Sequence, residues 1–386
     1  MKMKVVAIKS IADVSSGNTP SRRKSEYWNG SIPWITTGEL ESGYVTASKE
    51  CVTEKALKET ALKLYHKGTV LIAMYGQGKT RGTAAVLGIE ATVNQACAAL
   101  TVHSGCSKFL FYQLQNSYHA IRRLSNTGNQ ENLNTEIIRN FKILWPDELE
   151  QQKIAAILST QDKVIELKEK LLVQKQQQKK YLMQQLLTGK KRLSGFCEKW
   201  TRKQLGELFE NRVEINRSDL GLLAITSTRG ILPRDCLDLK DNSSEDKSKY
   251  LRICPGDIGY NTMRMWQGVS AYSEYEGIVS PAYTILAPME GVYSHYFAYL
   301  FKTRSVIFSF YRFSQGLVDD TRNLKYENFK KISVFIPSNV AEQRAIVQIL
   351  STADHEIDLL QKSIEAEKQK KKALMQLLLT GAVRAK

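Results

Sequence analysis

The side chains with the clearest chemical potential lie in a glycine-rich segment that follows a predicted strand. Residues Ala73–Thr80 read AMYGQGKT, which satisfies a relaxed phosphate-binding loop pattern. A true loop of that class opens a helix whose N-terminus faces the phosphates, whereas Arg81, a glycine and another strand-like run follow here. We therefore favour a loop that holds Lys79 and Arg81 out towards DNA phosphates or a guanine edge. An ATPase that uses Lys79 is kept as an alternative.

A second segment, Asn261–Gly268, occupies the equivalent place later in the chain and reads NTMRMWQG. Asn261, Arg264 and Gln267 are of the types that can bond two atoms of one base edge, arginine to guanine and the amides to adenine. Trp266 either stacks on a nucleic acid or packs in the protein core, and the sequence leaves both interpretations open. The segment predicts contacts to DNA bases.

Other polar residues in predicted turns extend this candidate surface. Asn94 and Gln95 either read bases or tie down a turn between strands. The polar loop 126–134 either approaches DNA or caps the next element. Each arginine, taken alone, is expected to contact a phosphate, or nothing, rather than a base. The full set of candidates is Thr36, Thr37, Lys79, Arg81, Asn94, Gln95, Gln130, Asn132, Thr226, Arg229, Asn261, Arg264, Trp266, Gln267, Arg312 and Arg322.

Composition favours an anionic polymer as partner, because the 386 residues carry a formal charge of +16. The alternative is a basic, soluble protein whose charge serves no anionic partner. The six cysteines and five histidines are scattered, which predicts neither a zinc site nor a disulfide framework. There is no run of about eighteen apolar residues, no signal-peptide core and no dinucleotide or methyltransferase motif. The sequence predicts a cytoplasmic, metal-free and non-catalytic chain.

The elements that must position these residues include one long repeat. Residues Glu150–Gly189 and Glu342–Gly381 align without a gap, and roughly half of their positions are identical. Each copy begins with an acidic residue, ends at a glycine suited to a C-terminal cap, and has no proline or glycine between. We expect two helices of about 60 Å each.

Both copies carry apolar residues at alternating steps of three and four, which is coiled-coil spacing. Two equal helices in one chain most simply pack on each other as an antiparallel pair, although each could instead cover its neighbouring domain. The residues expected to hold this spacer and to dock partners are Ile154, Leu158, Ile165, Leu172, Ile346, Leu350, Ile357 and Leu360.

The segments before each helix mix short β-branched runs with glycine- and asparagine-rich turns and one helical stretch each. Faint matches between them, such as Ile35-Thr-Thr37 with Ile225-Thr-Ser227, predict a shared fold with different polar surfaces. The expected class is α+β, with two mixed globular domains joined by the helix pair. The expected boundaries are 1–146 and 194–338 for the globular domains, and 147–193 and 339–386 for the helices.

At this point the chain resembles a type I restriction-modification specificity subunit. The likeness rests on Ile11-Ala-Asp-Val-Ser-Ser-Gly17, on Ile32-Pro-Trp34, on the repeated Glu-Gln helix starts at 150 and 342, and on the Leu-Leu-Thr-Gly ends at 189 and 381. No single motif decides the matter, but their order and spacing extend over essentially the whole chain.

The resemblance implies that each globular domain is a target-recognition domain that reads one half of a split, asymmetric DNA site. It implies that the helices set the gap between the halves and dock two copies of a methyltransferase subunit, to which a restriction subunit can be added. The chain itself would catalyse nothing and bind no cofactor, with S-adenosylmethionine, ATP and magnesium on the partners. A standalone DNA-binding protein and a specificity subunit of another DNA-modification system are the remaining alternatives.

Overall fold

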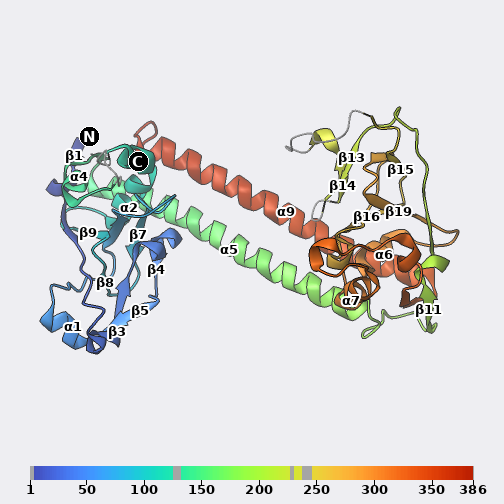
Figure 1. The fold of residues 1–386 in the computed structure, drawn as a ribbon. Helices are drawn as coiled ribbons and strands as arrows, with labels where there is room; N and C mark the ends of the chain where they lie inside the picture. Colours follow the sequence, from blue (N-terminus) through green and yellow to red (C-terminus); the bar gives the residue numbers. More distant parts are fainter. Residues whose placement is uncertain (1–3, 125–131, 227–229, 237–245, 386) are drawn as a thin grey trace. The chain divides into compact units, whose positions relative to one another are not determined.

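The structure is a computed structural model that describes residues 4–124, 132–226, 230–236 and 246–385. The chain divides into two compact units. The first contains Met1–Glu169 and Lys362–Lys386, and the second contains Lys170–Gln361. Each unit therefore combines one globular part with one stretch from each of two long helices (Figure 1).

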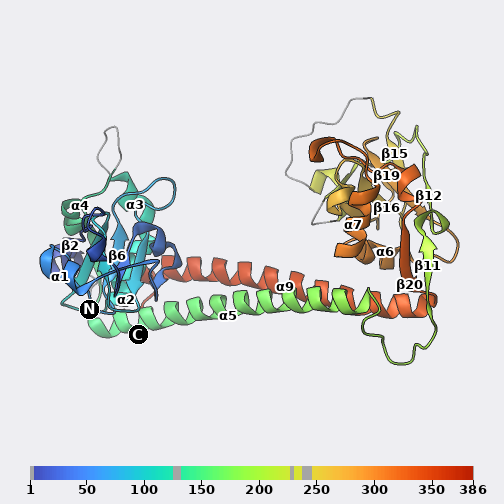
Figure 2. The ribbon, with the colours of Figure 1, turned by 60° about the horizontal axis from the view of Figure 1, so that its bottom comes forward.

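The two long helices are α5, Glu148–Leu186, and α9, Val340–Leu379. Asp147 starts α5 by accepting a hydrogen bond from the Glu150 backbone at 3.1 Å, and Asn339 does the same for Ala341 at 2.8 Å. Beyond their ends, Gly189 and Gly381 adopt φ of +69° and +75°, a left-handed conformation that suits glycine. Within each unit the start of one helix lies beside the end of the other, so the pair is antiparallel as expected (Figure 2).

The first unit is built on a five-stranded sheet of order β2-β9-β6-β7-β4 and a three-stranded sheet of order β5-β3-β8. A separate antiparallel pair, β1 with β10, places Val5 opposite Leu144 immediately before α5 begins. The strands are β1 Lys4–Ala7, β2 Ala12–Ser16, β3 Trp28–Ile35, β4 Tyr44–Val45, β5 Glu50–Val52, β6 Val70–Ala73, β7 Ala84–Leu87, β8 Thr92–Val93, β9 Cys97–Val102 and β10 Lys142–Trp145, and the short helices are α1 Glu54–Glu59, α2 Ser107–Asn116, α3 Tyr118–Arg123 and α4 Thr135–Asn140.

The second unit repeats this plan with a four-stranded sheet of order β12-β19-β16-β17 and an antiparallel pair of β11 with β20. Two smaller antiparallel pairs join β13 to β14 and β15 to β18. The strands are β11 Trp200–Gln204, β12 Phe209–Asn211, β13 Leu223–Ile225, β14 Ile231–Pro233, β15 Leu251–Ile253, β16 Ile258–Asn261, β17 Ser270–Tyr272, β18 Gly277–Val279, β19 Tyr283–Pro288 and β20 Ser333–Pro337, and the short helices are α6 Ser294–Leu300, α7 Arg304–Phe313 and α8 Tyr326–Phe329.

The ends of the long helices belong to the cores of the globular parts. Ile154 and Leu158 of α5 are fully buried in one core with Leu378 and Leu379 of α9. Ile346 and Leu350 of α9 are buried equally in the other core, with Leu186 and Leu187. The expectation that these four isoleucine and leucine side chains dock partner proteins is therefore wrong, because such burial leaves no surface to touch. Ile165, Leu172, Ile357 and Leu360 are half-buried along the helices.

Candidate nucleic-acid interface

The glycine-rich loop of the first unit joins β6 to β7. Gly76, Gly78 and Gly82 have φ of +138°, +59° and +84°, which a residue with a side chain would adopt only under strain. The loop leads directly into strand β7, so the helix that a phosphate-binding loop requires is missing from this position and the ATPase alternative loses its support. Lys79 is exposed at the tip.

Two side chains of helix α3 hold this loop in place by hydrogen bonds. The Tyr118 hydroxyl donates to the Lys79 carbonyl at 2.7 Å, and the Arg122 guanidinium donates to the Arg81 carbonyl at 2.9 Å. Arg81 itself is only 7% exposed, so the expectation that the loop holds Arg81 outward is wrong. Lys79 is left as the outward cation of this pair.

The other candidates in the first unit have mixed surroundings. Thr36 donates from its backbone and its hydroxyl to the Glu39 carboxylate, at 2.7 and 2.8 Å, and so caps the short helix Thr37–Ser42. In the turn before β9 the Asn94 backbone carbonyl accepts from the Cys97 backbone, and the Asn94 side-chain oxygen has no hydrogen-bond partner among the described residues. Gln95 is exposed, Asn132 is half-buried, and Gln130 lies outside the described residues.

The equivalent loop of the second unit follows β16 and contains the short helix Met265–Gln267. The Asn261 side chain accepts a hydrogen bond from the Met263 backbone at 2.9 Å, so it shapes the loop. Arg264 and Gln267 are exposed. The Trp266 ring is half-buried, donates to the Met263 carbonyl at 3.0 Å and meets the Tyr311 ring edge-on at 6.2 Å.

Helix α7 supplies the next part of this surface. Arg312 is exposed near its end. Arg322 stacks over the Tyr311 ring at 4.0 Å, donates to the Tyr311 hydroxyl at 2.9 Å and pairs with Asp319 at 2.8 Å. Arg322 is therefore engaged within the protein. Thr226 donates to the Gly230 carbonyl at 2.8 Å, and Arg229 lies outside the described residues.

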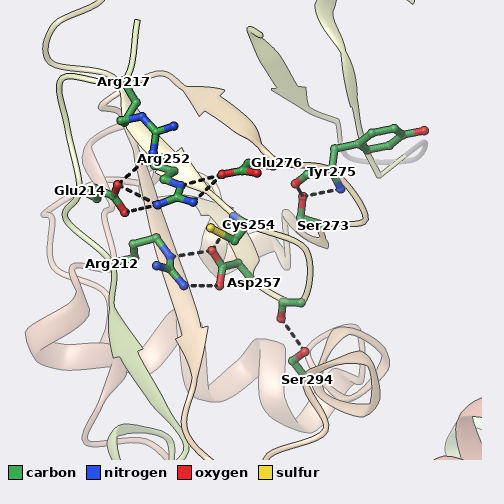
Figure 3. Close-up of polar contacts among 11 residues, drawn as sticks. Arg212, Glu214, Arg217, Arg252, Cys254, Asp257, Ser273, Tyr275, Glu276 and Ser294 are labelled. Atoms are coloured by element: carbon green, nitrogen blue, oxygen red, sulfur yellow. Dashed lines mark hydrogen bonds and ion pairs between the residues drawn. The ribbon is translucent and has the colours of Figure 1, made fainter. Parts of the chain in front are cut away.

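Several arginines of the second unit are neutralised in an ion-pair network (Figure 3). Arg252 of β15 bonds Glu214 at 2.8 Å and also pairs with Glu276. The two contacts tie β15 to the segments that contain these glutamates. Arg212 bonds both carboxylate oxygens of Asp257, at 2.8 and 3.2 Å. The hydrogen bond from Arg252 lowers the pKa of Glu214 below its ordinary value. These contacts hold the strands together, so the arginines involved add little to the field that an anion meets.

One arrangement near the helix pair occurs in both units. In the first, Asp162 accepts from the Tyr112 hydroxyl at 2.7 Å and pairs with Lys371 at 2.6 Å. In the second, Asp354 accepts from the Tyr299 hydroxyl at 2.7 Å and pairs with Lys179. We call each set a Lys–Asp–Tyr triad. Burial, and then the carboxylate contact, raise the pKa of each tyrosine.

Each triad lines a groove between its globular part and the long helices. The groove of the first unit has a volume of about 630 Å³ and also includes Lys108 and Gln115. That of the second has about 580 Å³ and includes His295 and Lys302 at the corresponding places. Lys302 donates to the carbonyls of Gly268 and Ser270, and burial lowers its pKa to about 8. The sequence interpretation missed both triads.

Among the described residues, no group of three or more histidine, cysteine, aspartate or glutamate side chains could hold a metal ion. None of the helices in that part of the chain is both long enough and apolar enough to cross a membrane.

Residues 1–177 match the family described as the type I restriction modification DNA specificity domain. This part of the chain, less than half of its 386 residues, is similar to that family. The MjaIX specificity subunit of Methanocaldococcus jannaschii is 34% identical over 172 residues, which are 43% of this chain and 39% of the relative. The EcoR124I/EcoR124II specificity subunit of Escherichia coli is 29% identical over 151 residues, which are 38% of this chain and 37% of the relative.

The match thus spans less than half the length of either curated relative. The similarity of fold to solved structures covers more of the chain than the sequence similarity does. The S subunit of a type I restriction-modification system from M. genitalium matches 98% of this chain and 96% of its own, with a TM-score of 0.61 at 17% identity. The resemblance to type I specificity subunits that the sequence indicated is confirmed, and so is the two-domain α+β architecture with paired helices.

Proposed function

We propose that this chain is the DNA-specificity subunit of a type I restriction-modification complex and that each unit reads one half of a split, asymmetric site. The observation that carries the proposal is the duplicated loop after β6 and β16. The two copies have equivalent places in equivalent sheets, but one presents Lys79 and the other presents Arg264 and Gln267. A shared scaffold with different exposed side chains suits two readers of different sequences.

We further propose that the chain catalyses nothing and directs adenine methylation by two copies of a methyltransferase subunit, with room in the assembly for a restriction subunit. S-adenosylmethionine, ATP and magnesium belong to those partners in this proposal. The duplicated grooves support it, because the Lys–Asp–Tyr triads give each unit a similar surface beside the helix pair. Two like surfaces suit a partner present in two copies.

Modified-base sequencing of the host genome, with and without the gene, tests the proposal. We expect loss of methyladenine at one split, asymmetric motif. Complementation with Arg264→Ala combined with Gln267→Ala should alter recognition in one half of the motif and leave the other half unchanged. An unchanged methylation pattern, together with tight DNA binding by the chain alone, would instead indicate a standalone DNA-binding protein.

A further inference from the structure

A pinned loop follows α7 in the second unit. Gln315 and Asn323 exchange two backbone hydrogen bonds of 2.8 Å each, which closes the loop at its base. Leu324, directly after it, donates to the Thr262 carbonyl at 2.9 Å, so the loop is fastened to the segment that carries Arg264. We name residues 315–323 the pinned loop.

The side of the loop is fixed as firmly as its base. The Arg322 guanidinium lies over the Tyr311 ring and pairs with Asp319. The Thr321 backbone donates to the Val318 carbonyl at 3.0 Å. A loop held in this way loses little conformational freedom when it binds, which favours affinity.

The exposed side chains of the pinned loop are unusually apolar for a surface turn. Leu317 is 100% exposed and Val318 is 59% exposed, so two adjacent apolar side chains lie at its tip. Asp320 is also exposed and has no ion-pair partner in the described part of the chain. The exposed arginines Arg264 and Arg312 lie on the two segments to which the loop is fastened. Cations beside an apolar tip suit a surface that meets phosphates at its rim and bases at its centre.

We propose that the pinned loop reads bases in the major groove, with Leu317 against the C5-methyl group of a thymine and Asp320 accepting a hydrogen bond from the N4 amino group of a cytosine. Both contacts are ones for which the major groove offers a distinct partner. The minor groove presents mainly acceptors for A·T pairs and a strong negative potential, which would repel Asp320. The inference rests on the proposed function.

The thymine contact is tested with DNA in which deoxyuridine replaces one thymine at a time, because this removes only the methyl group. The complex is purified through a tag on this chain, and the half-sites come from the methylation map. We expect wild type to lose about fourfold in affinity at one thymine of the half-site read by the second unit. Leu317→Ala should lose a similar factor on normal DNA and no longer distinguish that thymine from deoxyuridine.

The cytosine contact is tested by base substitution at each cytosine of the same half-site. Asp320→Asn should lose about tenfold in preference for cytosine at one position and leave the other positions unchanged. Met289→Ala and Glu290→Gln are matched controls, since both side chains are exposed in the turn after β19 of the same unit. Neither should change any base preference.

The outcomes separate this inference from the proposed function. If Arg264→Ala weakens binding while Leu317→Ala and Asp320→Asn keep every wild-type preference, the pinned loop does not read bases and the DNA-specificity role stands. If the purified complex shows no sequence preference at all, both proposals fail.

Discussion

Glu150 and Glu342 occupy the same position in the first turns of the two long helices, and each is buried beneath an arginine that follows the end of the other helix. Arg384 bonds Glu150 through Nε at 2.7 Å and through a second nitrogen. Arg192 bonds Glu342 at 2.6 and 2.7 Å. The first pair lies in the first unit and the second pair in the second unit. Each pair therefore closes the junction where one long helix begins and the other ends.

Arg384→Met should destabilise the first unit, because it leaves the Glu150 carboxylate buried without its cation. The loss should be smaller than that for a fully buried pair, since the Arg384 side chain is 33% exposed. The free energy of unfolding in urea measures the loss. Lys153→Met, an exposed cation of the same helix turn, should leave stability unchanged.

The same pair predicts a pH dependence. The hydrogen bond from Arg384 holds the pKa of Glu150 below its ordinary value of 4.5. The stabilisation is therefore complete above that ordinary value and is lost as the pH falls through the lowered pKa. Wild type and Arg384→Met should converge in stability in acid. A constant difference down to pH 3 would contradict the assignment.

Leu350→Lys should unfold the second unit rather than merely loosen the helix pair. Leu350 is 0% exposed in the core of that unit, and burying an unpaired ammonium there should cost more than about 4 kcal/mol. Hydrogen exchange should show lost protection in α6 and β19 and retained protection in β6 and β9. Leu359→Lys, at a position 51% exposed on the same helix, is the matched control and should show neither change.

Lys302→Gln should change how stability depends on pH above neutrality. Burial lowers the pKa of Lys302 to about 8, whereas the unfolded chain keeps its proton up to about 10.5. Between these values the folded protein releases a proton that the unfolded chain retains, so the wild type gains stability as the pH rises. Glutamine cannot titrate, and it is the residue that the first groove has at the corresponding place, Gln115.

Urea unfolding at several pH values measures this effect. Between pH 8 and pH 10, the free energy of unfolding of the wild type should rise by about 2 kcal/mol relative to that of Lys302→Gln. Gln115→Glu, in the first groove, should leave the slope above pH 8 unchanged. Parallel curves for wild type and Lys302→Gln would show that Lys302 keeps its ordinary pKa.

Arg312→Ala should weaken DNA binding and reduce the slope of log K against log salt by about 1, as expected for one lost phosphate contact. Arg264→Ala should instead relax preference at one base pair and leave the slope nearly intact, because Arg264 is proposed to read a base. Arg202→Ala, an exposed arginine on β11, serves as the control and should change neither quantity.

The long helices could be predicted from sequence because each signal was local: acidic starts, glycine ends and an unbroken apolar period. The burial of Arg81 could not, because Tyr118 and Arg122, which fix its loop, lie on a helix that only the fold brings near. The pinned loop has no sequence signal, since a leucine in a turn is equally compatible with surface and core. The triads do have one: Asp162 with Asp354, and Lys179 with Lys371, occupy matching positions of the repeat.

Each unit contains residues from both long helices, and this arrangement orders the steps of folding during synthesis. The second unit is continuous in sequence from Lys170 to Gln361, so it can close as soon as its last residue leaves the ribosome. The first unit cannot close then, because Leu378 and Leu379 of its core are made after the whole of the second. Until they arrive, the apolar face around Ile154 and Leu158 is open to water, and a nascent chain of this kind depends on rapid completion or on a chaperone to escape aggregation.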